Sequence, residues 1–328
     1  MKAIHVGLGG FGIGWPRLIN GRNDVELIAA VDRNEATFEK VKEFNVPCFT
    51  SLEDAFKAVG KPDFIINATP PGIHLAINRL AFSYFDKPIP VLMEKPIAEN
   101  FADIREMLEH AKNGQKIMIA ENYRYTTANV FAKNEIQSRL RNISAINMVF
   151  RQHHHMPDTN YHAHMEHPAM IDIGVHHIDL LRFFTGMDVH RVYAQLAKPP
   201  WSWYRGLSNV KMLAEMDNGV QFCYDCSMDS YAKTNWYGNW TFTAENGVAR
   251  YFGDKLIFNM EDGDIELDVP KNVPSSDKAG IMDEFLAYLQ HDVLPQTSLT
   301  DQAKNAAVVE AGIQAAKQGR SIKVEDLK

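Results

Sequence analysis

The chain has 328 residues, of which 45% are hydrophobic and 23% charged, a balance typical of a globular protein with one large or two medium-sized domains. Its 34 basic and 41 acidic residues give a net charge of −7, which supplies no positive field to attract nucleic acid or an anionic membrane. Three cysteines are too few for a disulfide framework, and no run of 18 apolar residues occurs. We therefore expect a cytoplasmic protein whose partner is a small molecule.

The first 120 residues alternate short β-branched runs with helical patterns, which is typical of a doubly wound parallel sheet. Predicted helices cover residues 35–44, 51–59 and 101–113. Predicted strands cover residues 2–6, 27–31, 64–67, 91–93 and 117–119.

A glycine motif lies between the first predicted strand and the helical stretch after it. Residues 7–12 read Gly-Leu-Gly-Gly-Phe-Gly. In this context the first glycine permits a tight turn, the second lets the backbone approach a pyrophosphate, and the third lets the helix pack on the sheet. Asp32 ends the second predicted strand, where a carboxylate binds ribose hydroxyls. The motif predicts NAD binding, with NADP as the alternative because Arg33 can contact a 2′-phosphate.

From about residue 123 the pattern changes to an α+β domain. Strands are predicted at 143–151, 210–217, 220–224, 239–244 and 255–258, mostly in an antiparallel sheet, and a helix at 301–317. We expect residues 1–122 to form an NAD(P)-binding Rossmann domain. Residues 123–328 form the predicted substrate-binding and oligomerisation domain, whose C-terminal helix can pack back on the first.

Two further motifs indicate catalysis. Glu94-Lys95-Pro96 ends the fourth predicted strand, where open α/β sheets bind ligands, and a lysine there can donate to a substrate oxygen or exchange a proton. Asp172 and His176 lie four residues apart in a predicted helix and therefore share a face. A carboxylate beside an imidazole orients the ring and raises its basicity.

Together these motifs resemble the glucose–fructose oxidoreductase/inositol dehydrogenase/MocA (Gfo/Idh/MocA) family. The resemblance spans nearly the whole chain. It rests on the glycine motif, Ala68-Thr69-Pro70-Pro71 with His74, Glu94-Lys95-Pro96, Asn122-Tyr123-Arg124-Tyr125, Asp172-Ile173-Gly174-Val175-His176 and Gly319-Arg320-Ser321. It implies a Rossmann domain, then an α+β domain with an open-faced sheet, and assembly as a homodimer or homotetramer.

The resemblance also implies roles for individual residues. Lys95 becomes the catalytic lysine, His176 the general acid/base and Asp172 its partner, with a cis peptide bond before Pro96. The expected substrate contacts are Tyr123, Arg124, His155, His164 and His177. The expected cofactor contacts are Gly7, Gly9, Gly10, Phe11, Gly12, Asp32, Arg33, Ala68, Thr69, Pro70, His74, Glu94 and Lys95.

Eight of the 13 histidines lie between residues 153 and 177. No tight ligand spacing such as His-Glu-x-x-His occurs, so we expect no bound metal and interpret several of these imidazoles as donors and acceptors in a polyol pocket. Residues 164–168, His-Met-Glu-His-Pro, replace the glycine-rich stretch of many relatives and leave the substrate class open. Aromatic residues concentrate between 201 and 240, where an oligomer interface is favoured over sugar stacking.

The sequence predicts an NAD(P)-dependent dehydrogenase that transfers hydride between nicotinamide and a secondary alcohol of a sugar, cyclitol or related polyol. Two alternatives remain. One is a metal-assisted isomerase or hydrolase that retains its NAD, and the other is a non-catalytic NAD(H)-sensing protein.

Overall fold

A parallel six-stranded sheet forms the centre of the N-terminal part of the computed structural model, which describes residues 1–324. All five predicted strands are confirmed, and the short β3 was not predicted. The strands are β1 (Lys2–Val6), β2 (Glu26–Val31), β3 (Cys48–Phe49), β4 (Phe64–Asn67), β5 (Val91–Met93) and β6 (Ile117–Ile119), in the order β3-β2-β1-β4-β5-β6. β2 and β3 follow on one side of β1, and β5 and β6 follow on the far side of β4. Because the chain proceeds in opposite directions across the sheet, right-handed crossovers place helices on both faces.

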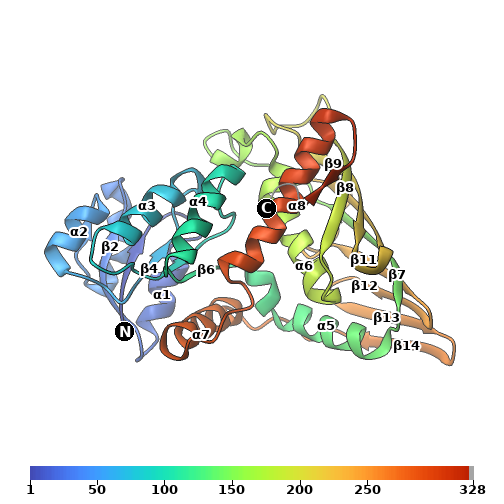
Figure 1. Cartoon of the computed structure of the whole chain (residues 1–328), viewed down its shortest axis with the longest axis horizontal. Helices are drawn as coiled ribbons and strands as arrows, with labels where there is room; N and C mark the ends of the chain where they lie inside the picture. The colour runs from blue at the N-terminus through green and yellow to red at the C-terminus, as the bar shows by residue number, and fades with distance from the viewer. Residues whose placement is uncertain (325–328) are drawn as a thin grey trace. The chain divides into compact units, whose positions relative to one another are not determined.

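The helices of this sheet begin where side chains cap them. Ser51 Oγ accepts from Asp54 N–H at 3.1 Å before α2 (Leu52–Val59), and Asn100 Oδ1 accepts from Asp103 N–H at 3.0 Å before α4 (Phe101–Lys112). Figure 1 shows α4 beside α3 (Pro71–Ser83), a helix that was not predicted. The predicted helix 35–44 is instead a 3₁₀ segment.

Within residues 1–324 the second sheet has nine strands. In it β7 and β10 run parallel, and each of the other neighbouring pairs is antiparallel. The strands are β7 (Ile143–Arg151), β8 (Val189–Ala197), β9 (Asn209–Met216), β10 (Gln221–Ser227), β11 (Asn239–Ala244), β12 (Gly247–Tyr251), β13 (Lys255–Met260), β14 (Gly263–Asp268) and β15 (Ile322–Lys323), in the order β14-β13-β12-β11-β7-β10-β9-β8-β15. The predicted Rossmann-plus-α+β fold class is confirmed.

The two faces of this second sheet differ. Alternate residues bury one face against α5 (Thr127–Arg139) and α6 (Val175–Thr185), which Figure 1 shows on the same side. The ring of Phe184 in α6 meets the rings of Trp240 at 5.5 Å and Phe242 at 6.0 Å. On the other face Tyr193 and Leu213, which are opposite each other in β8 and β9, are 37% and 59% exposed. The sheet is therefore open on that face.

The chain divides into two compact units. The first contains residues 1–122 and 277–303, and the second contains 123–276 and continues from 304. Residues 277–303, expected in the second domain, thus group with the first, and residues 325–328 lie outside the described part. The reason is visible in α7 (Ser276–His291), where Phe285 packs edge-on against Phe64 of β4 with ring centres 5.3 Å apart. The helix α8 (Leu299–Gln318) begins in the first unit and continues in the second.

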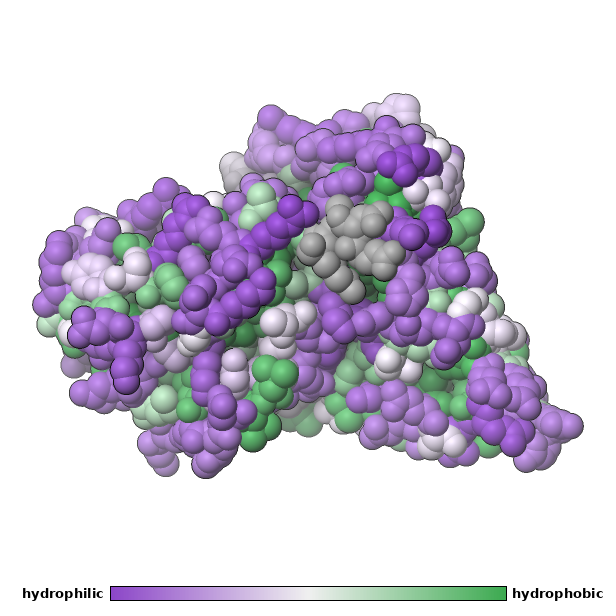
Figure 2. Space-filling model, viewed as in Figure 1, coloured by the Kyte–Doolittle hydropathy of each residue, from purple (hydrophilic) through white to green (hydrophobic). Residues whose placement is uncertain are grey.

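Hydrophilic residues cover most of the face shown in Figure 2, with hydrophobic residues between them. Among residues 1–324, no helix combines the length and the apolar character that crossing a bilayer requires.

The core of the second unit yields a stability prediction. Trp240 has no exposed surface, and Thr241 beside it points to the other face. Trp240→Ala should lower the free energy of unfolding by about 3–5 kcal/mol because it leaves a cavity against Phe184. Thr241→Ala is the matched control and should change it by less than about 1 kcal/mol. Urea unfolding of both variants, followed by circular dichroism, checks this, and equal effects would contradict the described core.

Candidate active site

The glycine loop after β1 is closed on one side and open on the other. Gly7 has a φ of 98°, and a Cβ there would lie 2.4 Å from the carbonyl oxygen of Ala68. A Cβ on Gly12 would lie 2.1 Å from the carbonyl oxygen of Gly7. At Gly9 and Gly10 no atom lies within 4 Å of such a position. The backbone is therefore bare where a pyrophosphate needs close approach, and the loop fits a dinucleotide.

Asp32 is held at the end of β2 by two backbone amides. Its Oδ2 accepts from Leu8 N–H at 2.7 Å and its Oδ1 from Asn34 N–H at 2.9 Å. The carboxylate thus stands beside the glycine loop with lone pairs left for ribose hydroxyls. Arg33 and Phe11 are exposed, Phe11 by 76%.

The turn that carries Ala68, Thr69 and Pro70 rests on His74 of α3. The buried ring of His74 places Nε2 2.7 Å from the carbonyl oxygen of Thr69 and Nδ1 3.0 Å from that of Ile97. Burial lowers the pKa of His74 below its usual value. Because both ring nitrogens face backbone carbonyls, we interpret His74 as a support for the turn rather than as a group that touches the cofactor.

Glu94 is fixed by two residues that the sequence analysis did not single out. Trp15 Nε1 donates to Glu94 Oε1 at 2.8 Å, and Lys278 Nζ lies 3.3 Å from the same oxygen. Lys278 Nζ also lies 4.4 Å from the centre of the Trp15 ring, a cation–π contact. The peptide bond between Lys95 and Pro96 is cis, as predicted. Nothing local in the sequence indicates that Lys278 meets Glu94, 184 positions away.

In the second unit, His176 lies near the start of α6 and is only 4% exposed. The ring of Tyr123 stacks on it with centres 4.2 Å apart and planes 15° from parallel. Tyr237 meets Tyr123 edge-on at 5.0 Å. The imidazole is thus held in a fixed plane by aromatic packing.

Asp172 lies in a π-helical turn, Ala169–Gly174, and not in the regular α-helix that the spacing predicted. Gly174 allows the wide turn, because a Cβ there would lie 2.8 Å from the carbonyl oxygen of Ala169. The regular α-helical repeat from which the shared face was predicted is therefore interrupted at Asp172. Asp172 Oδ1 lies 3.6 Å from His162 Nε2, an acid–imidazole pair that was not predicted.

Arg124 belongs to a buried ionic network. Its Nε donates to Asp179 Oδ2 at 2.8 Å and its Nη2 lies 2.6 Å from Asp179 Oδ1. Asn305 Nδ2 donates to Asp179 Oδ1 at 2.7 Å, and Asn305 Oδ1 accepts from Arg182 Nη1 at 2.9 Å. The network joins the Tyr123 segment to α6 and α8. Because its guanidinium is committed there, we interpret Arg124 as a residue that positions Tyr123 rather than one that binds substrate.

The three histidines expected to contact substrate differ in their surroundings. His177 has no exposed surface. Its Nδ1 lies 2.8 Å from Tyr224 Oη and its Nε2 lies 3.1 Å from the Trp236 carbonyl oxygen. We therefore interpret His177 as a buried structural residue rather than a substrate contact. His164 is exposed with Nε2 2.6 Å from the Asp158 carbonyl oxygen, and His155 is exposed.

Within residues 1–324, no three His, Cys, Asp or Glu side chains converge as metal ligands.

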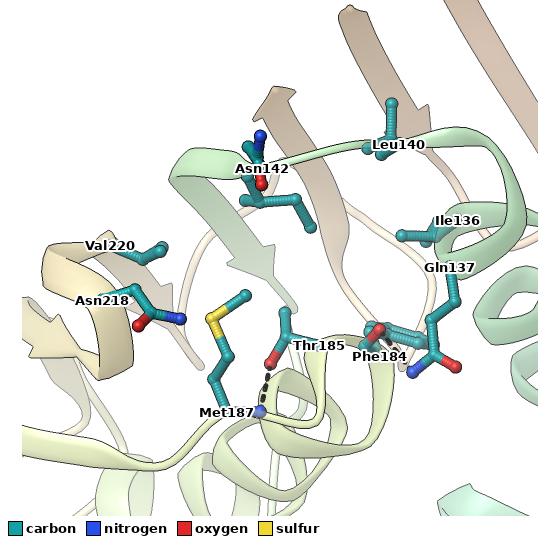
Figure 3. A pocket seen from close by; sticks show the side chains of 10 residues that line it. Ile136, Gln137, Leu140, Asn142, Phe184, Thr185, Met187, Asn218 and Val220 are labelled. Carbon is teal, nitrogen blue, oxygen red and sulfur yellow. Dashed lines mark hydrogen bonds between the residues drawn. The ribbon is translucent and has the colours of Figure 1, made fainter. Parts of the chain in front are cut away.

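A groove of about 580 Å³ opens elsewhere in the second unit (Figure 3). The ends of α5 and α6 and the turn after β9 form it. Its lining residues are Ile136, Gln137, Leu140, Asn142, Ile143, Phe184, Thr185, Met187, Asn218 and Val220, none of which is a predicted site residue.

The buried ion pair leads to a stability prediction. Asp179→Asn leaves the guanidinium of Arg124 buried without its charge partner and should lower the free energy of unfolding by about 3–5 kcal/mol. Asp158→Asn removes an exposed pair with Arg205 and should cost less than about 1 kcal/mol. Urea unfolding of both variants measures the two changes in free energy. Similar small losses of stability in both would contradict a buried network.

His177 leads to a pH prediction. Burial lowers its pKa from 6.5 to about 3, so the unfolded chain binds more protons at this site between those values. Stability should therefore fall as the pH drops from 6.5 toward 3, by about 1.4 kcal/mol per unit for this group. His177→Gln, whose amide can bond to the same two partners, should weaken this dependence, and exposed His291→Gln should not. Urea unfolding at pH 7 and pH 5 gives the comparison, and equal slopes would contradict it.

Comparisons with known proteins identify the family and agree with the fold. The model for an oxidoreductase family with an NAD-binding Rossmann fold, GFO/IDH/MocA, matches residues 1–122, and the model for the GFO/IDH/MocA C-terminal domain matches residues 137–250. Inositol 2-dehydrogenase of Pseudarthrobacter chlorophenolicus is 25% identical over 333 residues, 99% of this chain and 96% of the relative. D-apiose dehydrogenase of Paraburkholderia graminis is 25% identical and covers 81% of this chain and 74% of its own length.

A solved oxidoreductase from Agrobacterium radiobacter, in complex with NAD⁺, L-tartaric acid and magnesium, has the same fold, with a TM-score of 0.90 and 21% identity over 100% of this chain and 99% of that one. The two family models together match more than half of the chain, with one match in each unit. The chain therefore belongs to the Gfo/Idh/MocA family and is an oxidoreductase with an NAD-binding Rossmann fold.

Proposed function

We propose that the chain oxidises a secondary alcohol of a sugar, cyclitol or related polyol, with His176 as the general base. The observation that carries this proposal is the environment of His176, an almost fully buried imidazole stacked on Tyr123 beside a π-helical turn that carries an acid. π-Helical turns are frequent at functional sites. The relatives named inositol 2-dehydrogenase and D-apiose dehydrogenase support a polyhydroxylated substrate.

In the proposed reaction His176 takes the proton of the hydroxyl group that is oxidised. Lys95 donates a hydrogen bond to the same oxygen and stabilises negative charge that develops there. Asp172 balances the positive charge that the imidazole gains, and His162, 3.6 Å from Asp172, shares in orienting that carboxylate. NAD, held by the first unit, would supply the acceptor for the hydride that leaves the oxidised carbon. In the reverse direction His176 returns the proton to a carbonyl oxygen.

The residues of the first unit would hold the cofactor in this scheme. The bare backbone at Gly9 and Gly10 would bind the pyrophosphate and Asp32 a ribose. Glu94, fixed by Trp15 and Lys278, would bind the nicotinamide ribose. Asp32 favours NAD over NADP, because a carboxylate beside the 2′-position repels a phosphate. We also propose assembly as a homodimer or homotetramer through the open face that carries Tyr193 and Leu213.

The test is absorbance at 340 nm with NAD or NADP and a panel of sugars, cyclitols and sugar acids. With the substrate so found, Lys95→Ala and His176→Ala should each lower kcat by about 10²–10⁴-fold, because each removes a group that moves or stabilises a proton. His190→Ala, on the exposed end of β8, is the control and should keep full activity. NAD titration by fluorescence should show unchanged binding in His176→Ala. Near-native turnover of both variants would reject the assignment.

A further inference from the structure

Three loops of the second unit lie at the same end of the strands of its sheet. β7 and β10 run parallel with Ser227 opposite Arg151, so the segments that follow them emerge together. β9 is antiparallel to β10 with Asn209 opposite Ser227, so the segment that precedes it ends at the same edge. These three segments are residues 152–160, 228–238 and 198–208. The sheet thereby gathers residues that lie far apart in the sequence.

Aromatic and imidazole rings from these loops contact one another. His153 stacks on Tyr231 with centres 4.2 Å apart and planes 25° from parallel, and its ring lies 4.7 Å from that of Trp203. The ring of Trp203 also lies 4.9 Å from that of His155. Trp236 meets His154 edge-on at 5.2 Å. We call these six residues, His153, His154, His155, Trp203, Tyr231 and Trp236, the aromatic platform.

Two members of the platform expose large ring surfaces. Tyr231 is 86% exposed and Trp236 43%, while Trp203 is half-buried and fixed by a hydrogen bond from its Nε1 to the His154 carbonyl oxygen at 2.9 Å. Large aromatic surfaces left in water are costly unless a ligand or partner covers them. Tyr231 is stacked on His153, and Trp236 packs on Phe150 at 5.9 Å as well as on His154.

Ring contacts connect the platform to the proposed base. Trp236 is followed by Tyr237, whose ring meets Tyr123, and Tyr123 stacks on His176. The Trp236 carbonyl oxygen also lies 3.1 Å from Nε2 of the buried His177. The platform therefore adjoins the residues around His176 through Trp236 and Tyr237.

The chemistry of the platform suits a sugar ring. A pyranose has a face of C–H groups that packs on an aromatic ring and a rim of hydroxyl groups, and neutral imidazoles can both donate to and accept from such groups. A purely apolar ligand would leave the imidazoles unpaired, and a chain with a net charge of −7 does not favour nucleic acid.

We propose that the aromatic platform binds a second sugar ring, so that the substrate is a disaccharide or other glycoside of which one ring is oxidised and the other is held. This inference rests on the proposed function, because it extends the substrate of the same site. The second ring would be bound equally in the ground and transition states, so losing it should raise KM more than it lowers kcat.

The experiment measures sugar binding and turnover separately. Calorimetric titration in the presence of NADH, which cannot oxidise the sugar, compares maltose, cellobiose and trehalose with glucose and myo-inositol. At least one disaccharide should bind about tenfold more tightly than glucose, and Tyr231→Ala should remove about five- to tenfold of that affinity, a loss in the range of one stacked ring. Tyr84→Ala, which removes an exposed ring of the first unit, is the control and should change affinity less than twofold.

The outcomes separate the two proposals. Binding of a disaccharide that depends on Tyr231, without absorbance at 340 nm, would support the platform and reject the proposed function. Turnover of a monosaccharide with no gain from a second ring would support the function and overturn the platform. An unchanged disaccharide affinity in Tyr231→Ala would also overturn it. So would sedimentation showing that Tyr231→Ala dissociates an oligomer, because the rings would then contact a second copy of the chain.

Discussion

The second unit depends on neutralising one buried charge. Asp179 on α6 has no exposed surface, and an isolated carboxylate in that position would cost several kcal/mol. Arg124 and Asn305 supply the donors, one from the segment before α5 and the other from α8. Three pieces of chain that are distant in sequence must therefore meet at Asp179. Because Tyr123 adjoins Arg124, the same ion pair holds the ring that stacks on His176.

The first unit depends on a steric constraint instead. The glycine loop passes so close to the Ala68 turn that neither Gly7 nor Gly12 can carry a side chain. The His74 ring contacts the Thr69 carbonyl oxygen in that turn, and the Asp32 carboxylate accepts a hydrogen bond from the Leu8 amide in the loop. Backbone contacts thus set the geometry, which leaves the outer surface of the loop bare for a phosphate group.

The aromatic residues between 201 and 240 do not form one class. Trp240 and Tyr204 are buried, 0% and 1% exposed, and belong to the packing of the unit. Trp203 and Trp236 lie at the sheet edge among histidines. From the sequence, the same expectation applies to all of them, namely an oligomer interface rather than sugar stacking. Trp240 lies in β11, where alternate residues point into the core. Tyr204 lies in a loop, but its hydroxyl donates to the His154 carbonyl oxygen at 3.0 Å and its ring is enclosed.

The sequence by itself determined the parallel strands, the glycine motif with Asp32, the cis bond at Pro96 and the family. Each depends on short-range signals: hydrophobic runs, glycines that the backbone requires, and motifs of a few adjacent residues. Only the tertiary structure decided that Lys278 meets Glu94, that Asp179 pairs with Arg124 and that residues 277–303 join the first unit. These contacts join residues 55 or more positions apart, and pairing of that kind is set by packing and the neutralisation of buried charge, which no local pattern records.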